Sequence, residues 1–159
     1  MKSTKDDKNK SSASIFLKAA NFCAYQERSH KEVLQRLSEW GIMGLNAGEI
    51  ITQLIEHNYL NEERFATAFA GGKFRTKHWG KNKIKAELKL HDISDYCIQK
   101  ALNEIEPTDY IHTLQNELDK KFSQTKENNI LSKRAKVARY LVGKGFEPEI
   151  IWQLLKEKH

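Results

Sequence analysis

The chain has 159 residues, of which 39% are hydrophobic and 30% charged, and its formal net charge is +6. It contains no apolar run of about 20 residues and no signal-peptide pattern, so we expect neither membrane spanning nor export and assign it to the cytoplasm. With 2 Pro and 8 Gly, and few alternating apolar runs, the sequence predicts an all-α fold.

The first helices follow a polar N-terminal stretch. Residues 1–13 show no apolar periodicity and are predicted to be a disordered basic tail. Ser29 and Glu32 match a capping box, in which the two side chains satisfy free backbone donors at a helix start. Gly41 is predicted to end that helix, and Asn61 to cap a later one.

An internal repeat organises the remaining helices. Three segments share an apolar pair at positions i and i+4, then a turn residue, then another apolar residue. These segments are Val33–Ile42, Ile84–Ile93 and Val137–Phe146. We predict a tandem array of three three-helix repeats, at residues 14–58, 59–107 and 108–159, that forms an elongated, curved rod. Such arrays usually bind other macromolecules.

The Gly71-Gly72 pair is unfavourable inside a helix. It indicates either a local break or the close approach of another helix or a partner, and the sequence does not decide between them. Cys23 and Cys97 form no Cys-x-x-Cys pair, which argues against a zinc site. Both lie among apolar neighbours and are expected to be buried free thiols.

No motif for catalysis is present. The six histidines are scattered, and none belongs to a recognisable arrangement of base and nucleophile. There is no GxxxxGK[ST] loop to hold a phosphate. We therefore expect a protein that is not an enzyme and that needs no cofactor and no metal.

Two basic stretches without acidic residues are the candidate binding surface. Clustered Lys and Arg at helical spacing can follow a phosphate backbone, and Arg can also bridge carboxylates of a protein. The candidate residues for binding DNA or a protein partner are Lys73, Arg75, Lys77, Lys81, Lys83, Lys85, Lys133, Arg134, Lys136, Arg139 and Lys144.

Single residues near these clusters have competing interpretations. Arg64 follows two glutamates and could form ion pairs within the fold or bind a partner. Trp79 could stack on a base, although packing between repeats is the preferred interpretation. We expect Trp40 and Trp152 to pack between helices. The aromatic residues expected in the core are Phe65, Phe69, Tyr110, Phe122 and Phe146.

Three segments, in order along the chain, are similar to those of one family. Residues 59–66, YLNEERFA, resemble the "GYLDDERFA" segment of the RecX family, bacterial regulators of the RecA recombinase. Residues 79–88 resemble its "GxxxIxxEL" segment, and residues 135–151 its "RFLxxRGF" helix and the helix after it. The resemblance covers the chain from Ile15 onward.

A few positions depart from the family pattern. Asn58 and Asn61 stand where the family usually has Gly and Asp, and the Pro often found just after the position of Gly80 is absent. These changes concern turns and caps.

The resemblance implies a tandem array of three-helix units that lies in the groove of a RecA filament on single-stranded DNA. It implies inhibition of recombinase, ATPase and coprotease activities, and so a role in regulating DNA repair, recombination and the SOS response. The implied partners are the RecA filament and single-stranded DNA, with weaker binding to double-stranded DNA, and we expect a monomer.

Two alternatives remain open from the residues. In the first, a helix-turn-helix-type protein binds duplex DNA and uses residues 81–91 as its recognition helix, although Lys outnumbers the residues that read base edges. In the second, a helical scaffold binds an unrelated protein, which predicts binding that is insensitive to salt.

Overall fold

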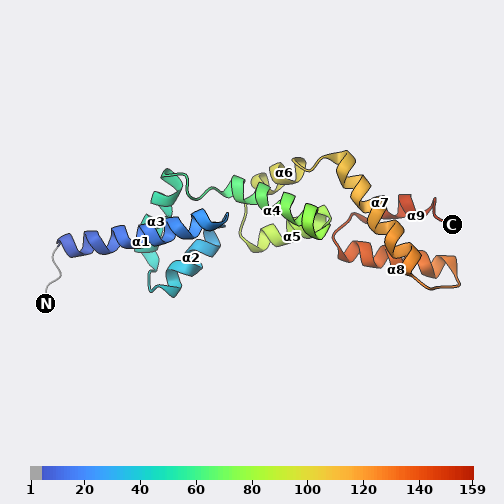
Figure 1. The fold of residues 1–159 in the computed structure, drawn as a ribbon, viewed down its shortest axis with the longest axis horizontal. Helices are drawn as coiled ribbons and strands as arrows, with labels where there is room; N and C mark the ends of the chain where they lie inside the picture. The colour runs from blue at the N-terminus through green and yellow to red at the C-terminus, as the bar shows by residue number, and fades with distance from the viewer. Residues whose placement is uncertain (1–4) are drawn as a thin grey trace. The chain divides into compact units, whose positions relative to one another are not determined.

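The computed structural model describes the backbone of residues 5–159 and the side chains from Ser12 onward. Over this range the chain forms nine α-helices and no strand, which confirms the all-α prediction (Figure 1). The helices are α1 (Lys5–Tyr25), α2 (His30–Glu39), α3 (Gly44–Glu56), α4 (Glu62–Lys77), α5 (Lys81–Leu90), α6 (Asp95–Asn103), α7 (Pro107–Gln124), α8 (Ile130–Gly143) and α9 (Pro148–Leu155). None of these described helices is both long and apolar enough to cross a membrane.

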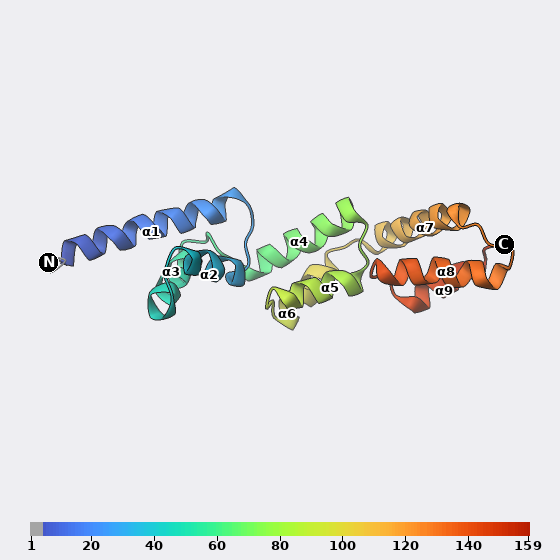
Figure 2. The same ribbon diagram turned by 90° about the horizontal axis from the view of Figure 1, so that it is seen from below.

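The residues group into two compact units. Unit 1 holds α1 to α3, the start of α4 as far as Phe65, and the segment His91–Ile93. Unit 2 holds Ala66–Leu90 and Ser94–His159. Within unit 2, the helices α7, α8 and α9 pack side by side (Figure 2).

The N-terminal stretch differs from the expectation of a disordered tail. Helix α1 begins at Lys5, inside the range 1–13 for which we predicted disorder, while residues 1–4 lie outside the described part of the chain. The three repeat ranges and the curved rod stay predictions.

Capping residues begin the helices as the sequence indicates. The Ser29 hydroxyl accepts a hydrogen bond from the Glu32 amide at 3.1 Å, and the Glu32 side chain completes the capping box. The Asn61 side chain accepts from the Arg64 amide at 2.9 Å at the start of α4. Pro148 stands in the first turn of α9, where its missing N–H costs little.

The middle helices α2, α5 and α8 end in the same backbone conformation. The turn residues Gly41, Asp92 and Gly145 have φ angles of 81°, 59° and 100°, all in the left-handed region. The following N–H groups of Ile42 and Phe146 then bond back to carbonyls five residues earlier, at 2.8 and 3.1 Å. The left-handed turn is common to all three segments that the sequence aligns, and the back-bond is common to the first and third.

Helix α4 runs without a break through Gly71 and Gly72, so the interpretation of a local break is wrong. A Cβ added at Gly71 would lie only 2.7 Å from the Arg75 guanidinium, whereas one added at Gly72 would meet nothing within 4 Å. The close approach at Gly71 therefore comes from the chain's own side chain one helical turn later.

Aromatic side chains fill much of the core of unit 2. Tyr110 packs between Phe74 and Phe146, with ring centroids 5.8 and 5.5 Å apart. All three are buried, as the apolar pattern predicted for Tyr110 and Phe146. Trp152 is 41% exposed, because it flanks the buried face of α9 that holds Ile151 and Leu155, so the packing between helices that we expected covers it only in part.

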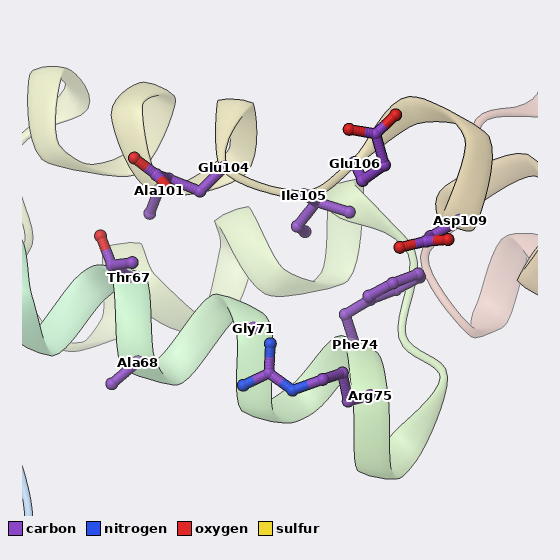
Figure 3. Close-up of a pocket in the computed structure, with 10 residues that line it drawn as sticks. All are labelled: Thr67, Ala68, Gly71, Phe74, Arg75, Ala101, Glu104, Ile105, Glu106 and Asp109. Carbon is purple, nitrogen blue, oxygen red and sulfur yellow. The ribbon is translucent and has the colours of Figure 1, made fainter.

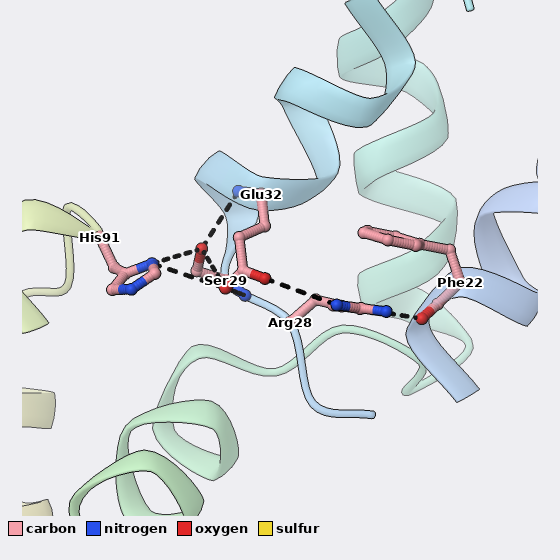
Figure 4. A network of polar contacts seen from close by, with 5 residues as sticks. All are labelled: Phe22, Arg28, Ser29, Glu32 and His91. Carbon is pink, nitrogen blue, oxygen red and sulfur yellow. Dashed lines mark hydrogen bonds and ion pairs between the residues drawn. The ribbon is translucent and has the colours of Figure 1, made fainter. Parts of the chain in front are cut away.

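In unit 1, the turn His91–Ile93 lies against the start of α2, and we call this contact the first junction. The Ser29 hydroxyl oxygen, fully buried, lies 3.3 Å from Nδ1 of His91, and a Glu32 carboxylate oxygen lies 3.5 Å from the same nitrogen (Figure 4). Arg28 in turn approaches Glu32 at 3.8 Å and donates to the Phe22 carbonyl. Side chains thus make this junction.

In unit 2, the turn Lys144–Phe146 lies against the start of α5, and we call this contact the second junction. The Gly80 amide donates to the Lys144 carbonyl at 2.8 Å, and the Asn82 amide donates to the Gly145 carbonyl at 2.9 Å. Free N–H groups at the start of α5 thereby satisfy free carbonyls at the end of α8. The positive end of the α5 dipole meets the negative end of the α8 dipole, which is favourable. Backbone atoms make this junction.

Tyr110 supports the second junction from the core. Its hydroxyl oxygen accepts from the Lys81 amide at 3.0 Å and its O–H donates to the Glu147 carboxylate. Burial, together with the hydrogen bond to Glu147, raises the pKa of Tyr110 well above its usual range, so the phenol stays protonated.

Candidate nucleic-acid interface

Trp79 lies in the link between α4 and α5 with two lysines at its ring. The Nζ atoms of Lys73, on α4, and Lys83, on α5, lie 5.1 and 4.4 Å from the ring centroid. Contacts of this kind hold an ammonium group against the negative face of the ring. The indole is half-buried, so it is neither a core residue nor fully free.

Tyr140, on α8, repeats this arrangement. It is 39% exposed, and the Nζ atoms of Lys121 and Lys144 lie 4.4 and 5.9 Å from its ring centroid. Intervals of three and four residues place Lys133, Lys136, Tyr140 and Lys144 on one face of this helix.

The two aromatic groups lie on either side of the second junction of unit 2. A Cβ added at Gly145 would lie closer than 3.0 Å to the backbone nitrogen of Lys83, so the Trp79 group directly adjoins the residue after Lys144. We call the two groups together the basic–aromatic strip. Its members are Lys73, Trp79, Lys83, Lys121, Tyr140 and Lys144.

Glu117, on α7, balances part of the charge at the strip. Its two carboxylate oxygens lie 2.7 Å from Nδ1 of His78 and 3.1 Å from Nζ of Lys144. Burial alone would raise the pKa of Glu117, but the hydrogen bonds from His78 and Lys144 outweigh burial and lower it. The carboxylate is therefore ionised and keeps Lys144 in place beside the second junction.

Arg75 does not join the strip. Its guanidinium folds back over Gly71 and lines a pocket between α4 and the segment that links α6 to α7 (Figure 3). The opposite wall of this pocket, of about 320 Å³, carries the carboxylates of Glu104, Glu106 and Asp109. Arg75 thus faces acidic groups of the chain itself.

The other predicted cations are dispersed over unit 2. Four have contacts within the chain: Lys81 over the Tyr110 ring, Lys133 over the Phe122 ring, Lys136 with Glu127, and Arg134 with the Lys158 carbonyl. Lys77, Lys85 and Arg139 are exposed and form no ion pair with any of the described residues. The structure therefore brings together Lys73, Lys83 and Lys144 of the predicted set.

Sequence reasoning overlooked Lys121 and Tyr140. The spacing of Tyr140, four residues after Lys136 and four before Lys144, was a signal for the aromatic member. Nothing local identifies Lys121, because it reaches Tyr140 from another helix.

Arg64 has a structural role in unit 1. Its Nε donates to the Glu27 carboxylate at 2.6 Å, and its other nitrogens reach the Asn58 side chain and the Asn58 and Tyr59 carbonyls. Asn58 itself has a φ angle of 59°, a conformation that Asn tolerates better than most residues. This explains how Asn can occupy a position where the resembled family usually has Gly.

Among the described residues, no group of three or more His, Cys, Asp or Glu side chains could hold a metal ion. Cys23 and Cys97 are free and buried, as predicted. Burial raises the pKa of the Cys23 thiol to about 11, which keeps it in the less reactive protonated form.

Comparison with known proteins matches two family models. Residues 61–102 match "RecX, second three-helix domain", and residues 108–155 match "RecX, third three-helix domain". Together these ranges cover more than half of the chain.

Curated relatives carry the same family name. The regulatory protein RecX of Bacillus licheniformis is 29% identical over 142 residues, which cover 89% of this chain and 54% of the relative. The chain thus spans about half the length of the Bacillus relatives it matches. The regulatory protein RecX of Salmonella paratyphi A is 28% identical over 153 residues, with coverage of 89% and 90%.

Solved structures share the fold. The crystal structure of RecX from Lactobacillus salivarius has a TM-score of 0.83 at 25% identity and covers 92% of this chain and 95% of that one. A second crystal structure, of a regulatory protein RecX, has a TM-score of 0.78 at 18% identity, with coverage of 99% and 80%, and supports the fold alone. The three-helix domains, their order along the chain and these relatives show that the chain belongs to the RecX family of regulatory proteins.

Proposed function

We propose that this protein binds, as a monomer, the filament that RecA forms on single-stranded DNA and inhibits its recombinase, ATPase and coprotease activities. It would thereby regulate DNA repair, recombination and the SOS response in the cytoplasm without catalysing a reaction. Membership of a family of regulatory proteins supports a regulatory role. The observation that carries the proposal is the basic–aromatic strip, where lysines of three helices and the cap of α8 converge around two partly exposed rings.

The test adds the protein to RecA assembled on single-stranded DNA and follows ATP hydrolysis and strand exchange. We expect both rates to fall as the ratio of this protein to RecA rises. Absence of inhibition at every ratio would contradict the proposal.

Charge neutralisation tests whether the strip makes the contact. In the double variant Lys83→Gln, Lys121→Gln, we expect weaker inhibition of RecA. We also expect the slope of the logarithm of the binding constant against the logarithm of salt concentration to be less steep by about two. The matched control is Lys89→Gln, Lys156→Gln, which removes the same charge from exposed positions outside the strip. Equal loss in both variants would mean that total charge matters and the strip does not.

Sequence-specific binding to duplex DNA is disfavoured by the second junction. A recognition helix usually presents its N-terminal residues to the bases of the major groove. Here the first turn of α5 is bonded to the turn after α8 through Gly80 and Asn82. A shifted band that persists in excess random duplex competitor would favour sequence-specific binding to duplex DNA. Binding that is insensitive to salt would favour a helical scaffold that binds an unrelated protein.

A further inference from the structure

The rings of the basic–aromatic strip are more exposed than the buried ring of Tyr110 in the same unit. Tyr110 also has a lysine over its ring, with Nζ of Lys81 at 4.9 Å, but it is 3% exposed and belongs to the core. Tyr140 is 39% exposed and Trp79 is half-buried. A lysine contact by itself therefore does not explain why these two rings remain at the surface.

Each of the two rings combines an aromatic face with a pair of cations. Lys73 and Lys83 contact Trp79, and Lys121 and Lys144 contact Tyr140, with the pairs supplied by different segments of the chain. Binding to phosphates alone requires only the cations. A base stacked on an aromatic ring contributes more than an exposed contact between an ammonium and the same ring. A base can therefore displace an ammonium from the ring, and the ammonium then meets the neighbouring phosphate.

We propose that Trp79 and Tyr140 stack on unpaired nucleobases of a single strand while the four lysines of the strip bind its phosphates. The strip then prefers single-stranded over duplex nucleic acid, because the faces of bases in a duplex are already covered by their neighbours. This inference rests on the proposed function only in taking nucleic acid as the ligand of the strip, and it requires no contact with RecA.

The experiment uses the full chain with Trp79 as its single tryptophan, made by Trp40→Phe and Trp152→Phe. The probes are a thymidine oligonucleotide, an abasic oligonucleotide of the same length and charge, and a duplex. We expect the thymidine oligonucleotide to quench Trp79 fluorescence and to bind about 10-fold or more tightly than the abasic one. Equal affinity for the two single strands without quenching would mean that only phosphates are bound and would overturn the proposal, as would duplex binding of equal strength.

A second variant tests stacking at the other ring of the strip, so its result does not depend on how the chain folds around Trp79. Tyr140→Ala removes an exposed ring, and we expect affinity for the thymidine oligonucleotide to fall about 5- to 100-fold while the salt dependence stays unchanged. Tyr96→Ala is the matched control, since Tyr96 is 69% exposed on α6 of the same unit and outside the strip. Equal effects of the two substitutions would contradict a specific role for Tyr140.

The outcomes separate this inference from the proposed function. If the thymidine oligonucleotide binds as expected but RecA is not inhibited, stacking stands and the proposed function fails. If RecA is inhibited but Tyr140→Ala and the abasic oligonucleotide change nothing, the proposed function stands and stacking fails.

Discussion

The two junctions use the same turn in chemically different ways. In the first junction, a buried serine hydroxyl and a glutamate of α2 meet the His91 ring. In the second, Gly80 and Gly145 bring two backbones so close that amides of α5 bond directly to the end of α8. A junction of side chains can adjust to a substitution by changing rotamers, whereas a junction of two backbones cannot.

The largest expected effect is that of Gly145→Ala. The new methyl would overlap Lys83 and force a residue with φ of 100° to carry a side chain. We expect a loss of about 3 kcal/mol in the free energy of unfolding, from overpacking and backbone strain together, or about 6–12 °C in Tm. Gly41→Ala is the control, because its φ is also positive but no atom lies within 4 Å of the added methyl. Equal losses in thermal unfolding would show that the second junction contributes nothing.

Tyr110→Phe tests the buried support of the second junction. It leaves the Lys81 amide and the Glu147 carboxylate without their phenol partner. An unsatisfied buried polar group costs about 1–3 kcal/mol, so we expect a loss of about 2 kcal/mol in urea unfolding. Tyr96→Phe, at an exposed position, should change stability by less than about 0.5 kcal/mol.

Ser29→Ala tests the first junction. Loss of a capping hydroxyl costs about 1 kcal/mol, and the lost contact with His91 adds to it. Asn129→Ala, which removes the side-chain cap of α8 at an exposed position, serves as the reference for capping alone. Equal losses of the two variants in urea unfolding would mean that Ser29 acts only as a cap.

Gly72→Ala should stabilise the protein, in contrast to the three substitutions above. This glycine lies inside α4, and an added methyl meets nothing within 4 Å. Because alanine favours a helix over glycine, we expect a gain of about 0.5–1 kcal/mol in thermal or urea unfolding. A loss would show that this position, like Gly145, has a contact that requires glycine.

The smallest effect concerns pH and Glu117. Its pKa in the folded chain is lower than the ordinary value of 4.5, so its contribution to stability is present above that value and is lost as pH falls through the folded pKa. In Glu117→Gln, we expect the free energy of unfolding to fall less between pH 6 and pH 3 than in wild type, by less than about 1 kcal/mol. Urea unfolding between pH 6 and pH 3 measures it, with Glu157→Gln, at an exposed position, as the control. Parallel curves for wild type and Glu117→Gln would contradict the prediction.

The sequence by itself determined features that depend on neighbours along the chain. Helical periodicity, the caps at Ser29 and Asn61 and the repeated turn all arise from interactions within a few residues, so they could be predicted without tertiary structure. The family could also be identified from local motifs. The continuity of α4 could not, because the penalty of two glycines was overcome by the packing of the whole helix.

Only the tertiary structure decided which cations belong together. Arg75 and Lys73 are two residues apart, yet Arg75 lines an acidic pocket while Lys73 lies over Trp79, because positions two residues apart point to different sides of a helix. Lys121 joins Tyr140 from another helix, a contact with no signature in the local sequence. The sequence thus specified the helices and their turns, and packing between helices selected the candidate site from a larger set of similar charges.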